Sequence, residues 1–332
     1  MVIFISIFAF LISFTLCLVG KGRFLLAFPN ERSAHHKPTS RFGGIAIFTS
    51  LATANVTYTF LTGDMSSVVT LVMTMVLAIL VILGAFDDRK HLHPLIRLMG
   101  QMLFSLLAMY LLSYNFPFFS TNFINSVVGL FLMLAFINAA NFSDGLNGLW
   151  SGTFLLWAGY VGYFWSPMPF LWMMMAATFG FFVLNFPKGK VFLGDSGSTL
   201  LGGFALLYGL YLSHHFRLDF YFLTRLTIIF APFIFIFADI VMTLVLRVAQ
   251  GHSPFTPHKE HFYQKLIHRV GLSHGTVTTL YLFGSILSSF FIGFLTMKHF
   301  WVIGFAFYIP LQLLFFGGVY RWCHVCGLLK SS

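Results

Sequence analysis

The chain has 332 residues and a formal net charge of +10, with 58% hydrophobic and only 8% charged residues. A soluble domain usually carries about a quarter charged residues, so this composition excludes an ordinary water-soluble protein. Apolar stretches of about 20 residues, the length that spans the hydrocarbon core of a bilayer, recur from one end of the chain to the other. We therefore expect an all-α polytopic integral membrane protein.

The hydropathy pattern predicts eleven transmembrane helices. Their approximate ranges, in chain order, are 1–20, 43–62, 66–86, 95–114, 122–138, 148–165, 168–185, 197–213, 221–247, 275–297 and 299–320. The first stretch has no basic residue before Lys21 and no obvious cleavage site, so we expect it to remain as a helix. The helices are expected to form a single membrane-embedded domain over residues 1–332.

The basic residues are distributed unequally between the two sides of the membrane. Sixteen of the 19 Lys and Arg residues lie in the odd-numbered loops and the C-terminal tail, and only Arg217, Arg225 and Lys298 lie on the other side. This asymmetry predicts cytoplasmic odd-numbered loops, an external N-terminus and a cytoplasmic C-terminus. We expect anionic membrane lipids as partners of the basic loops, and no nucleic acid.

The polar residues also gather in the odd-numbered loops, which are rich in Gly, Asn, Asp, His and Lys. These loops cover residues 21–42, 87–94, 139–147, 186–196 and 248–274. A transporter concentrates polar residues near the bilayer midplane, often in two repeats, and no internal repeat is visible here. The pattern therefore favours an enzyme whose active site is built from these cytoplasmic loops. A transporter or flippase of anionic lipid-linked sugars is the alternative.

Two adjacent carboxylates, Asp87 and Asp88, follow the third predicted helix in the segment G-A-F-D-D-R. Like charges repel each other unless a cation lies beside them. Hard cations such as Mg²⁺ or Mn²⁺ take oxygen ligands, so the pair indicates a metal site. The alternative is a helix cap with an ion pair to Arg89 or Lys90, which accounts for one carboxylate better than for both.

Two further loops carry polar side chains next to glycines. The segment around 139–147 supplies Asn138, Asn141, Asp144 and Asn147, which indicates either close approach to a ligand or an ordinary tight turn. The segment F-L-G-D-S-G-S places Asp195 and Ser196 directly before a predicted helix. Such residues either cap the helix or leave its N-terminal amide groups open to a phosphate, and the sequence leaves both open.

The longest loop, 248–274, contains His258, Lys259 and His261. Two histidines three residues apart are compatible with zinc, but the neighbouring lysines favour an anionic ligand. A helix lying in the membrane interface is predicted to follow, because four apolar residues share one helical face: Phe262, Leu266, Ile267 and Val270.

The first cytoplasmic loop and the C-terminal tail are less informative. In H-K-P-T-S-R-F-G-G, Lys37 and Arg41 either belong to the general excess of basic residues in cytoplasmic loops or contact phosphate. The paired glycines Gly43 and Gly44 are compatible with a bound diphosphate. In the tail, Cys323, His324 and Cys326 offer too few ligands for a closed zinc site.

Five segments in order resemble the polyprenyl-phosphate N-acetylhexosamine-1-phosphate transferases (glycosyl transferase family 4), which initiate O-antigen, enterobacterial common antigen, teichoic acid and peptidoglycan lipid carriers. They are H-K-P-T-S-R-F-G-G, G-A-F-D-D-R, N-A-A-N-F-S-D-G-L-N-G, N-F-P-K-G-K-V-F-L-G-D-S-G-S and P-H-K-E-H-F-Y-Q. Each segment alone is a weak signal. Five in family order, one per cytoplasmic loop, are specific.

The resemblance implies transfer of an N-acetylhexosamine-1-phosphate from a UDP-sugar to undecaprenyl phosphate with release of UMP, at the bacterial cytoplasmic membrane. It implies Mg²⁺ as cofactor, with Mn²⁺ as a substitute, and leaves a homodimer open. The implied catalytic residues are Asp87, Asp88, Asp195, His258 and His261, with Asp195 and Asp88 at the metal. The implied substrate-binding residues are Lys37, Arg41, Asn138, Asn141, Asp144, Asn147, Phe192 and Lys259. Asp239 shares a helix face with Thr243 and Arg247 and is expected to support the site from outside it.

The chain departs from the family pattern at two positions, Asn147 in place of Asp and Lys259 in place of Arg. Asn147 is therefore expected to hydrogen-bond substrate or backbone and not to be an essential metal ligand. The contiguous histidine triplet of the peptidoglycan branch is absent, which favours the branch that initiates O-antigen and enterobacterial common antigen.

Overall fold

The structure, a computed structural model, describes residues 1–27, 38–63, 65–113, 123–164, 168–214, 220–253, 261–297, 318 and 321. Ten helices in this part of the chain coincide with predicted spans. They are α1 (Val2–Gly20), α2 (Gly43–Thr62), α3 (Met65–Lys90), α4 (Pro94–Ser113), α6 (Phe123–Phe142), α7 (Leu149–Phe164), α8 (Pro169–Asn185), α9 (Gly194–His214), α10 (Phe220–Ala249) and α12 (His274–Met297). The predicted span 299–320 lies, apart from residue 318, outside the described residues.

Six of the described helices, namely α1, α2, α3, α4, α10 and α12, are long and apolar enough to cross a membrane. Two shorter apolar stretches, Ser126–Phe142 and Pro169–Asn185, accompany them. The expectation of an all-α, multi-pass membrane protein is therefore confirmed. The total of eleven spans and their orientation remain predictions.

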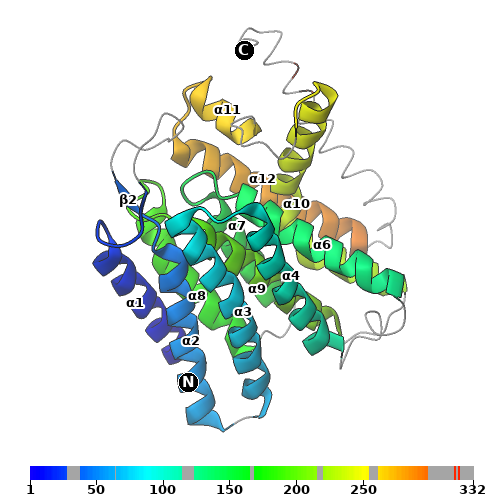
Figure 1. Ribbon diagram of the computed structural model, residues 1–332. Coiled ribbons are helices and arrows are strands. Elements are labelled where there is room, and N and C mark those ends of the chain that lie inside the picture. The colour runs from blue at the N-terminus through cyan, green and yellow to red at the C-terminus, as the bar shows by residue number, and fades with distance from the viewer. Residues whose placement is uncertain are drawn as a thin grey trace. The chain divides into compact units, whose positions relative to one another are not determined.

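The chain forms two compact units, Met1–Asp219 and Phe220–Ser332, which we call the first and the second unit. The expected single membrane domain over residues 1–332 remains a prediction. In the second unit, α10 packs against α12, and the short helix α11 (Phe262–His268) contacts both (Figure 1). The helix predicted after His261 is thus present, and its place in the membrane interface remains a prediction.

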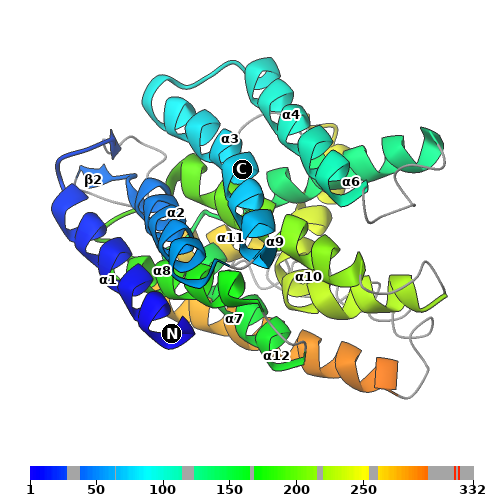
Figure 2. The same ribbon diagram turned by 90° about the horizontal axis from the view of Figure 1, so that it is seen from below.

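Helix α9 lies at the centre of the first unit and packs against α2, α3, α4, α6 and α7 (Figures 1 and 2). Helix α1 lies on the outside, against α2 and α8. Most of α9 is buried, and small residues make this close packing achievable. A Cβ at Gly202 would meet Ala140 of α6, and one at Gly203 would meet Leu80 of α3. The start of α9 is therefore held by several neighbouring helices.

A short hairpin that the sequence did not predict precedes α2. Its strands β1 (Leu26–Ala27) and β2 (Thr39–Ser40) pair antiparallel, with Leu26 opposite Ser40. The chain before α9 continues this backbone pairing, because Phe192 N–H donates to Ser40 O at 2.7 Å and Gly43 N–H donates to Phe192 O at 3.0 Å. The segment that leads into α9 is thereby tied to the start of α2.

The helices extend further toward the polar loops than predicted. Helix α3 continues to Lys90, α6 continues to Phe142, and α9 begins at Gly194. These helix ends lie about three or four residues beyond the approximate ends of the predicted spans. Hydropathy drops where charged residues begin, but the helix continues to Lys90. Its end is held by Asp87, whose carbonyl accepts the His91 N–H at 2.9 Å and whose Oδ1 accepts the Leu92 N–H at 2.7 Å.

Candidate active site

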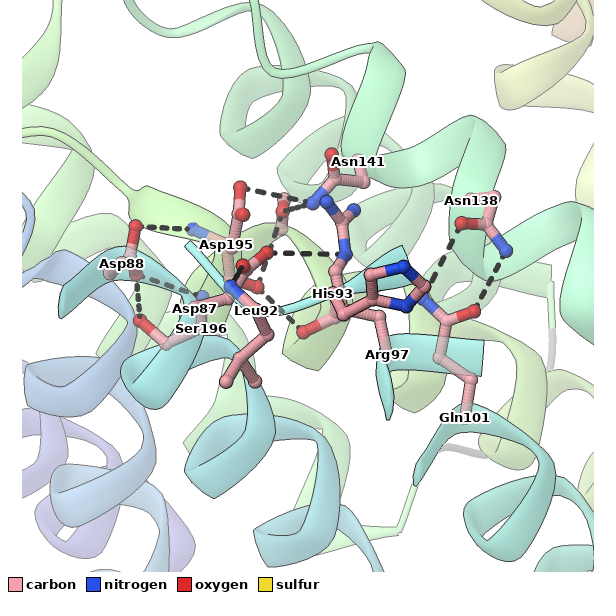
Figure 3. A network of polar contacts seen from close by, with 12 residues as sticks. Asp87, Asp88, Leu92, His93, Arg97, Gln101, Asn138, Asn141, Asp195 and Ser196 are labelled. Carbon is pink, nitrogen blue, oxygen red and sulfur yellow. Dashed lines mark hydrogen bonds and ion pairs between the residues drawn. The ribbon is translucent and has the colours of Figure 1, made fainter. Parts of the chain in front are cut away.

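Four carboxylates gather at one end of the first unit. Asp87 and Asp88 lie in the last turn of α3, Asp195 lies in the first turn of α9, and Asp144 lies in the loop between α6 and α7. Figure 3 shows Asp87, Asp88 and Asp195 side by side where these two helix ends meet. These residues come from three segments that the sequence analysis treated separately, and the fold brings them close together.

The carboxylate of Asp88 caps α9. Oδ1 accepts the Asp195 N–H at 3.1 Å, and Oδ2 accepts both the N–H and the hydroxyl of Ser196 at 3.2 Å. The guanidinium of Arg41 adds an ion pair at 3.6 Å, and the Asp88 side chain is only 1% exposed. A carboxylate offers about four acceptor positions, and these partners occupy them. Capping is thus the observed role of Asp88, while its role as a metal ligand remains a prediction.

The same contacts answer the question that the sequence left open at the start of α9. The amide groups of Asp195 and Ser196 face the carboxylate of Asp88, an anion supplied by the protein itself. A helix N-terminus favours an anion through its unpaired amide groups and its dipole. These two amide groups therefore bind a carboxylate cap and not a substrate phosphate.

Asp87 is held from the other side by α4 and the turn before it. Its Oδ1 accepts the Leu92 N–H at 2.7 Å, and its Oδ2 lies 3.1 Å from Nε of Arg97. Asp87 is 4% exposed. The ion pair and the amide fix the orientation of this carboxylate, so it faces the site with a defined geometry.

Asp195 faces Asn141 of α6. The amide Nδ2 of Asn141 donates to Asp195 Oδ1 at 3.1 Å and to Ser198 Oγ at 3.2 Å. Asp87 lies close enough to act on Asp195 as a neighbouring like charge. Asn141 therefore orients the carboxylate that the sequence predicts as the main metal ligand.

Asp144 adds a fourth carboxyl to the cluster. Burial raises the pKa of the Asp144 carboxyl well above its usual range, the negative charges of Asp195 and Asp88 raise it further, and Arg41 lowers it. Burial is the largest cause of this shift and the neighbouring carboxylates act in the same direction, so a cation in the cluster would favour the ionised form of Asp144.

The charges of the cluster fit a divalent cation. Four carboxyl groups stand against two guanidiniums, Arg41 and Arg97, so full ionisation of the cluster would leave two negative charges without a cationic partner from the protein. Buried charges are stable only when paired, and Mg²⁺ or Mn²⁺ takes carboxylate oxygens as ligands. Among the described residues, no three His, Cys, Asp or Glu side chains form a ready metal-binding group. The chemistry of the donor set is what fits the cation.

Two of the predicted substrate-binding amides bind protein groups. Asn138 of α6 exchanges hydrogen bonds with Gln101 of α4, donating at 2.8 Å and accepting at 3.4 Å (Figure 3). Asn147 donates to the carbonyl of Pro187 at 3.1 Å, so its hydrogen bond to backbone, one of the two expected roles, is observed. Phe192 joins the backbone pairing before α9. Contacts of these residues with substrate remain predictions.

The glycine pair that opens α2 packs closely against other parts of the protein, and the suggested diphosphate contact of this loop remains a prediction. A Cβ at Gly43 would overlap the ring of Phe181, and one at Gly44 would overlap the backbone of Gly197. Gly84 of α3 is packed in the same way against Ser196. These glycines let α2 and α3 approach the first turn of α9.

Several predicted residues cannot be placed in this cluster. Lys37, His258 and Lys259 lie outside the described residues, as does the tail with Cys323, His324 and Cys326. His261 is described in the second unit, where it precedes α11 and is 5% exposed. The part played by these residues in the reaction remains a prediction.

Three residues that contact the site were not predicted from the sequence: Arg97, Gln101 and Asn185. Asn185 accepts the Gly148 N–H at 2.5 Å and donates to Val191 O at 2.8 Å, which ties the α6–α7 loop to the chain before α9. Arg97 and Gln101 lie four residues apart on one face of α4, and that spacing was the available signal. Asn185 gave no signal beyond being polar at the end of an apolar span.

Comparison with known proteins agrees with this arrangement. The sequence model of glycosyl transferase family 4 matches residues 69–213, which include all four carboxylates. The decaprenyl-phosphate N-acetylglucosaminephosphotransferase of Mycobacterium tuberculosis is 28% identical over 295 residues, covering 77% of this chain and 72% of that protein. Two undecaprenyl-phosphate alpha-N-acetylglucosaminyl 1-phosphate transferases are each 30% identical. The protein from Yersinia pestis matches 74% of this chain and 70% of its own length. The protein from Escherichia coli matches 81% and 76%.

Identity of this level over most of both chains, together with the five ordered segments, establishes the family. The chain belongs to glycosyl transferase family 4, the polyprenyl-phosphate N-acetylhexosamine-1-phosphate transferases.

Proposed function

We propose that this protein transfers an N-acetylhexosamine-1-phosphate from a UDP-sugar to undecaprenyl phosphate, or to another polyprenyl phosphate, and releases UMP. The observation that carries the proposal is the buried carboxylate cluster of Asp87, Asp88, Asp144 and Asp195 within the part of the chain that matches the family. The relatives support it, since they are named as phosphotransferases of N-acetylglucosamine that act on decaprenyl phosphate or undecaprenyl phosphate.

The chain's own residues provide the positioning that such a transfer needs. The lipid phosphate is the nucleophile, so no Ser or Cys nucleophile is required, and catalysis depends on placing two polyanions together. Asp87, fixed by Arg97 and the Leu92 amide, is oriented to accept a proton from the lipid phosphate or to bind a cation. Asp195, oriented by Asn141, provides the second carboxylate.

Mg²⁺ or Mn²⁺ is the proposed cofactor. Asp195 would hold it as expected, and Asp87 would take the place of the expected Asp88, because the Asp88 oxygens bind the first turn of α9. When bound, the cation would neutralise charge that develops on the phosphate groups during the transfer. Asp88 supports this arrangement from behind, because it fixes the backbone of Asp195 through the amide contacts described above. Asn141 and Asp144 would then line the side that receives the nucleotide.

The polymer and the membrane orientation are finer parts of the same proposal. The H-x-x-H-x-Y-Q pattern without a histidine triplet favours the branch that initiates O-antigen and enterobacterial common antigen over the peptidoglycan branch. The distribution of basic residues favours eleven spans in the bacterial cytoplasmic membrane with the active site on the cytoplasmic side.

The proposal is tested with the purified protein in lipid nanodiscs, supplied with undecaprenyl phosphate and one UDP-sugar at a time. UMP release should require a UDP-N-acetylhexosamine, should not occur with UDP-N-acetylmuramoyl-pentapeptide, and should stop in EDTA and return with Mg²⁺ or Mn²⁺. The Asp195→Asn protein, purified in parallel, is the matched control and should release almost no UMP. Transport of a lipid-linked sugar without UMP release would contradict the proposal, and efficient use of the pentapeptide donor would contradict the branch.

A further inference from the structure

Asp239 is a buried carboxylate in α10 that the proposed reaction does not use. It is 1% exposed and accepts four hydrogen bonds. The donors are the hydroxyl of Thr243 at 3.1 Å, the Phe262 N–H at 2.9 Å, the Tyr263 N–H at 3.3 Å and the hydroxyl of Tyr281 at 2.7 Å. These four donors fill the acceptor positions of one carboxylate and come from α10, α11 and α12.

Two of the four donors are the first amide groups of α11. His261 occupies the N-cap position of this helix, and its own side chain makes no capping hydrogen bond. The first amide groups of a helix have no partner within the helix, and the helix dipole favours a negative charge beside them. Asp239 therefore caps α11 from a position 23 residues earlier than Phe262.

Burial of Asp239 and docking of α11 depend on each other. The stretch Ile228–Ala249 is long and apolar enough to cross a membrane, and a charged side chain in such a segment is costly unless it is paired. If α11 moved away, Asp239 would lose two donors and the helix would lose its cap, so groups on both sides would be left unsatisfied. This coupling fixes the start of α11 at the level of Asp239.

His261 is held by both its backbone and its ring. It directly precedes Phe262, whose amide donates to Asp239. Its ring stacks on that of Tyr263, with centroids 5.4 Å apart and an interplanar angle of 5°. Tyr263 in turn packs edge-on against Tyr281, at 6.0 Å and 89°. A displacement of α11 would therefore carry the imidazole with it.

We propose that Asp239 is a positioning residue for His261. By capping α11, it fixes the backbone and the ring of His261 in the orientation from which the imidazole binds the diphosphate or sugar of the donor. Asp239 itself does not contact substrate. The binding role of His261 rests on the proposed function, whereas the capping of α11 by Asp239 does not.

Two pairs of variants separate the cap from the rest of the network. Asp239→Asn replaces one acceptor oxygen with an NH₂ group that faces donors, and Tyr281→Phe removes a donor to Asp239 but leaves both α11 amides bonded. In the second pair, Phe262→Pro removes the first capping N–H, and Phe262→Ala removes the same aromatic ring but keeps the N–H. Proline is tolerated at the first helical position. His261 already has the extended conformation, φ −57° and ψ 143°, that residues before proline prefer.

The full-length variants in nanodiscs are compared by hydrogen–deuterium exchange and by steady-state kinetics. In Asp239→Asn, the α11 amides should exchange about tenfold faster than in wild type. In Phe262→Pro, the remaining α11 amides should exchange about tenfold faster than in Phe262→Ala. The KM for the UDP-sugar should rise about tenfold, with the KM for polyprenyl phosphate unchanged. Tyr281→Phe should stay within about twofold of wild type in both measurements.

The proposal would be overturned if the α11 amides exchanged no faster in Phe262→Pro than in Phe262→Ala. Proline by itself orders the first residue of a helix, so faster exchange can come only from loss of the capping N–H. Faster exchange with both KM values unchanged would also overturn it, since Asp239 would then only stabilise the helix. If Asp239→Asn does not insert or fold, the Phe262 pair decides the matter. A wild-type protein that releases no UMP would contradict the proposed function, while the exchange comparison would still decide whether Asp239 caps α11.

Discussion

Asp88 and Asp195 are both acidic residues of the same cluster, but their contacts differ. Asp88 accepts three hydrogen bonds from the first turn of α9 and pairs with Arg41, so its charge is satisfied by the protein. Asp195 accepts one from Asn141 and lies beside other carboxylates. The same chemical change should therefore destabilise the protein at Asp88 but not at Asp195.

Asp88→Asn should lower the free energy of unfolding by about 1 kcal/mol, the usual cost of a lost helix cap. Asp195→Asn should leave the melting temperature in EDTA unchanged or raise it, because it removes a like charge from beside Asp87. Both variants should lose most of their turnover. Thermal unfolding of the purified proteins, with kcat measured on the same samples, tests this. A larger loss of stability in Asp195→Asn than in Asp88→Asn would contradict the assignment.

Asn147 makes a weaker contribution than the carboxylates. Its amide donates to the carbonyl of Pro187, and a neutral hydrogen bond contributes about 1 kcal/mol net. Asn147→Ala should therefore lower kcat/KM by about tenfold at saturating Mg²⁺. Asp195→Asn, measured alongside, should lose several kcal/mol of transition-state stabilisation. An Asn147→Ala protein that folds but is as inactive as Asp195→Asn would place position 147 in the catalytic core.

At the scale of helices, close packing around the first turn of α9 positions the site. A Cβ at Gly44 would overlap the backbone of Gly197, whereas one at Gly159 of α7 would meet nothing within 4 Å. Gly44→Ala should therefore destabilise the protein by about 1–3 kcal/mol and displace Asp195, with a large loss of activity. Gly159→Ala, the control, should be neutral or stabilising, because alanine favours helix. Equal melting temperatures and activities in the two variants would refute the packing argument.

The sequence predicts helices better than it predicts the contacts of their ends. The ten described spans agree with the helices because a long apolar run both spans a membrane and forms a helix. The end of α3 was placed too early because Asp87 and Asp88 interrupt the apolar pattern without interrupting the helix. The hairpin of β1 and β2 escaped prediction because each strand has only two residues.

The residues of the carboxylate cluster could be singled out from the sequence, but their hydrogen-bond partners could not. Asp87, Asp88 and Asp195 stand out because carboxylates are rare in this chain. That Asp88 caps α9 depends on a partner 107 residues away, which no local pattern reveals. The role of Gly44 depends in the same way on the distant Gly197.

At the scale of the whole molecule, membrane orientation decides which face meets the nucleotide sugar. Gly63 and Gly251 are matched reporter positions, since both are exposed turn glycines with positive φ, +62° and +77°, and open space around a Cβ. In a protein whose three native cysteines are replaced by serine, a cysteine at Gly63 should react with an impermeant external thiol reagent in intact cells. A cysteine at Gly251 should react only after the membrane is opened. The reverse pattern would contradict a cytoplasmic active site.

The central claim is that the phosphate nearest the sugar moves together with the sugar. The most direct measurement uses a UDP-N-acetylhexosamine that carries a radioactive label on its β-phosphate, with undecaprenyl phosphate and Mg²⁺ as the other components. The account predicts that the label appears in the lipid fraction, in equal amount to the UMP released, and that Asp195→Asn abolishes both. Label that stays in water-soluble UDP while the sugar reaches the lipid, or sugar lipid that forms without UMP, would contradict it.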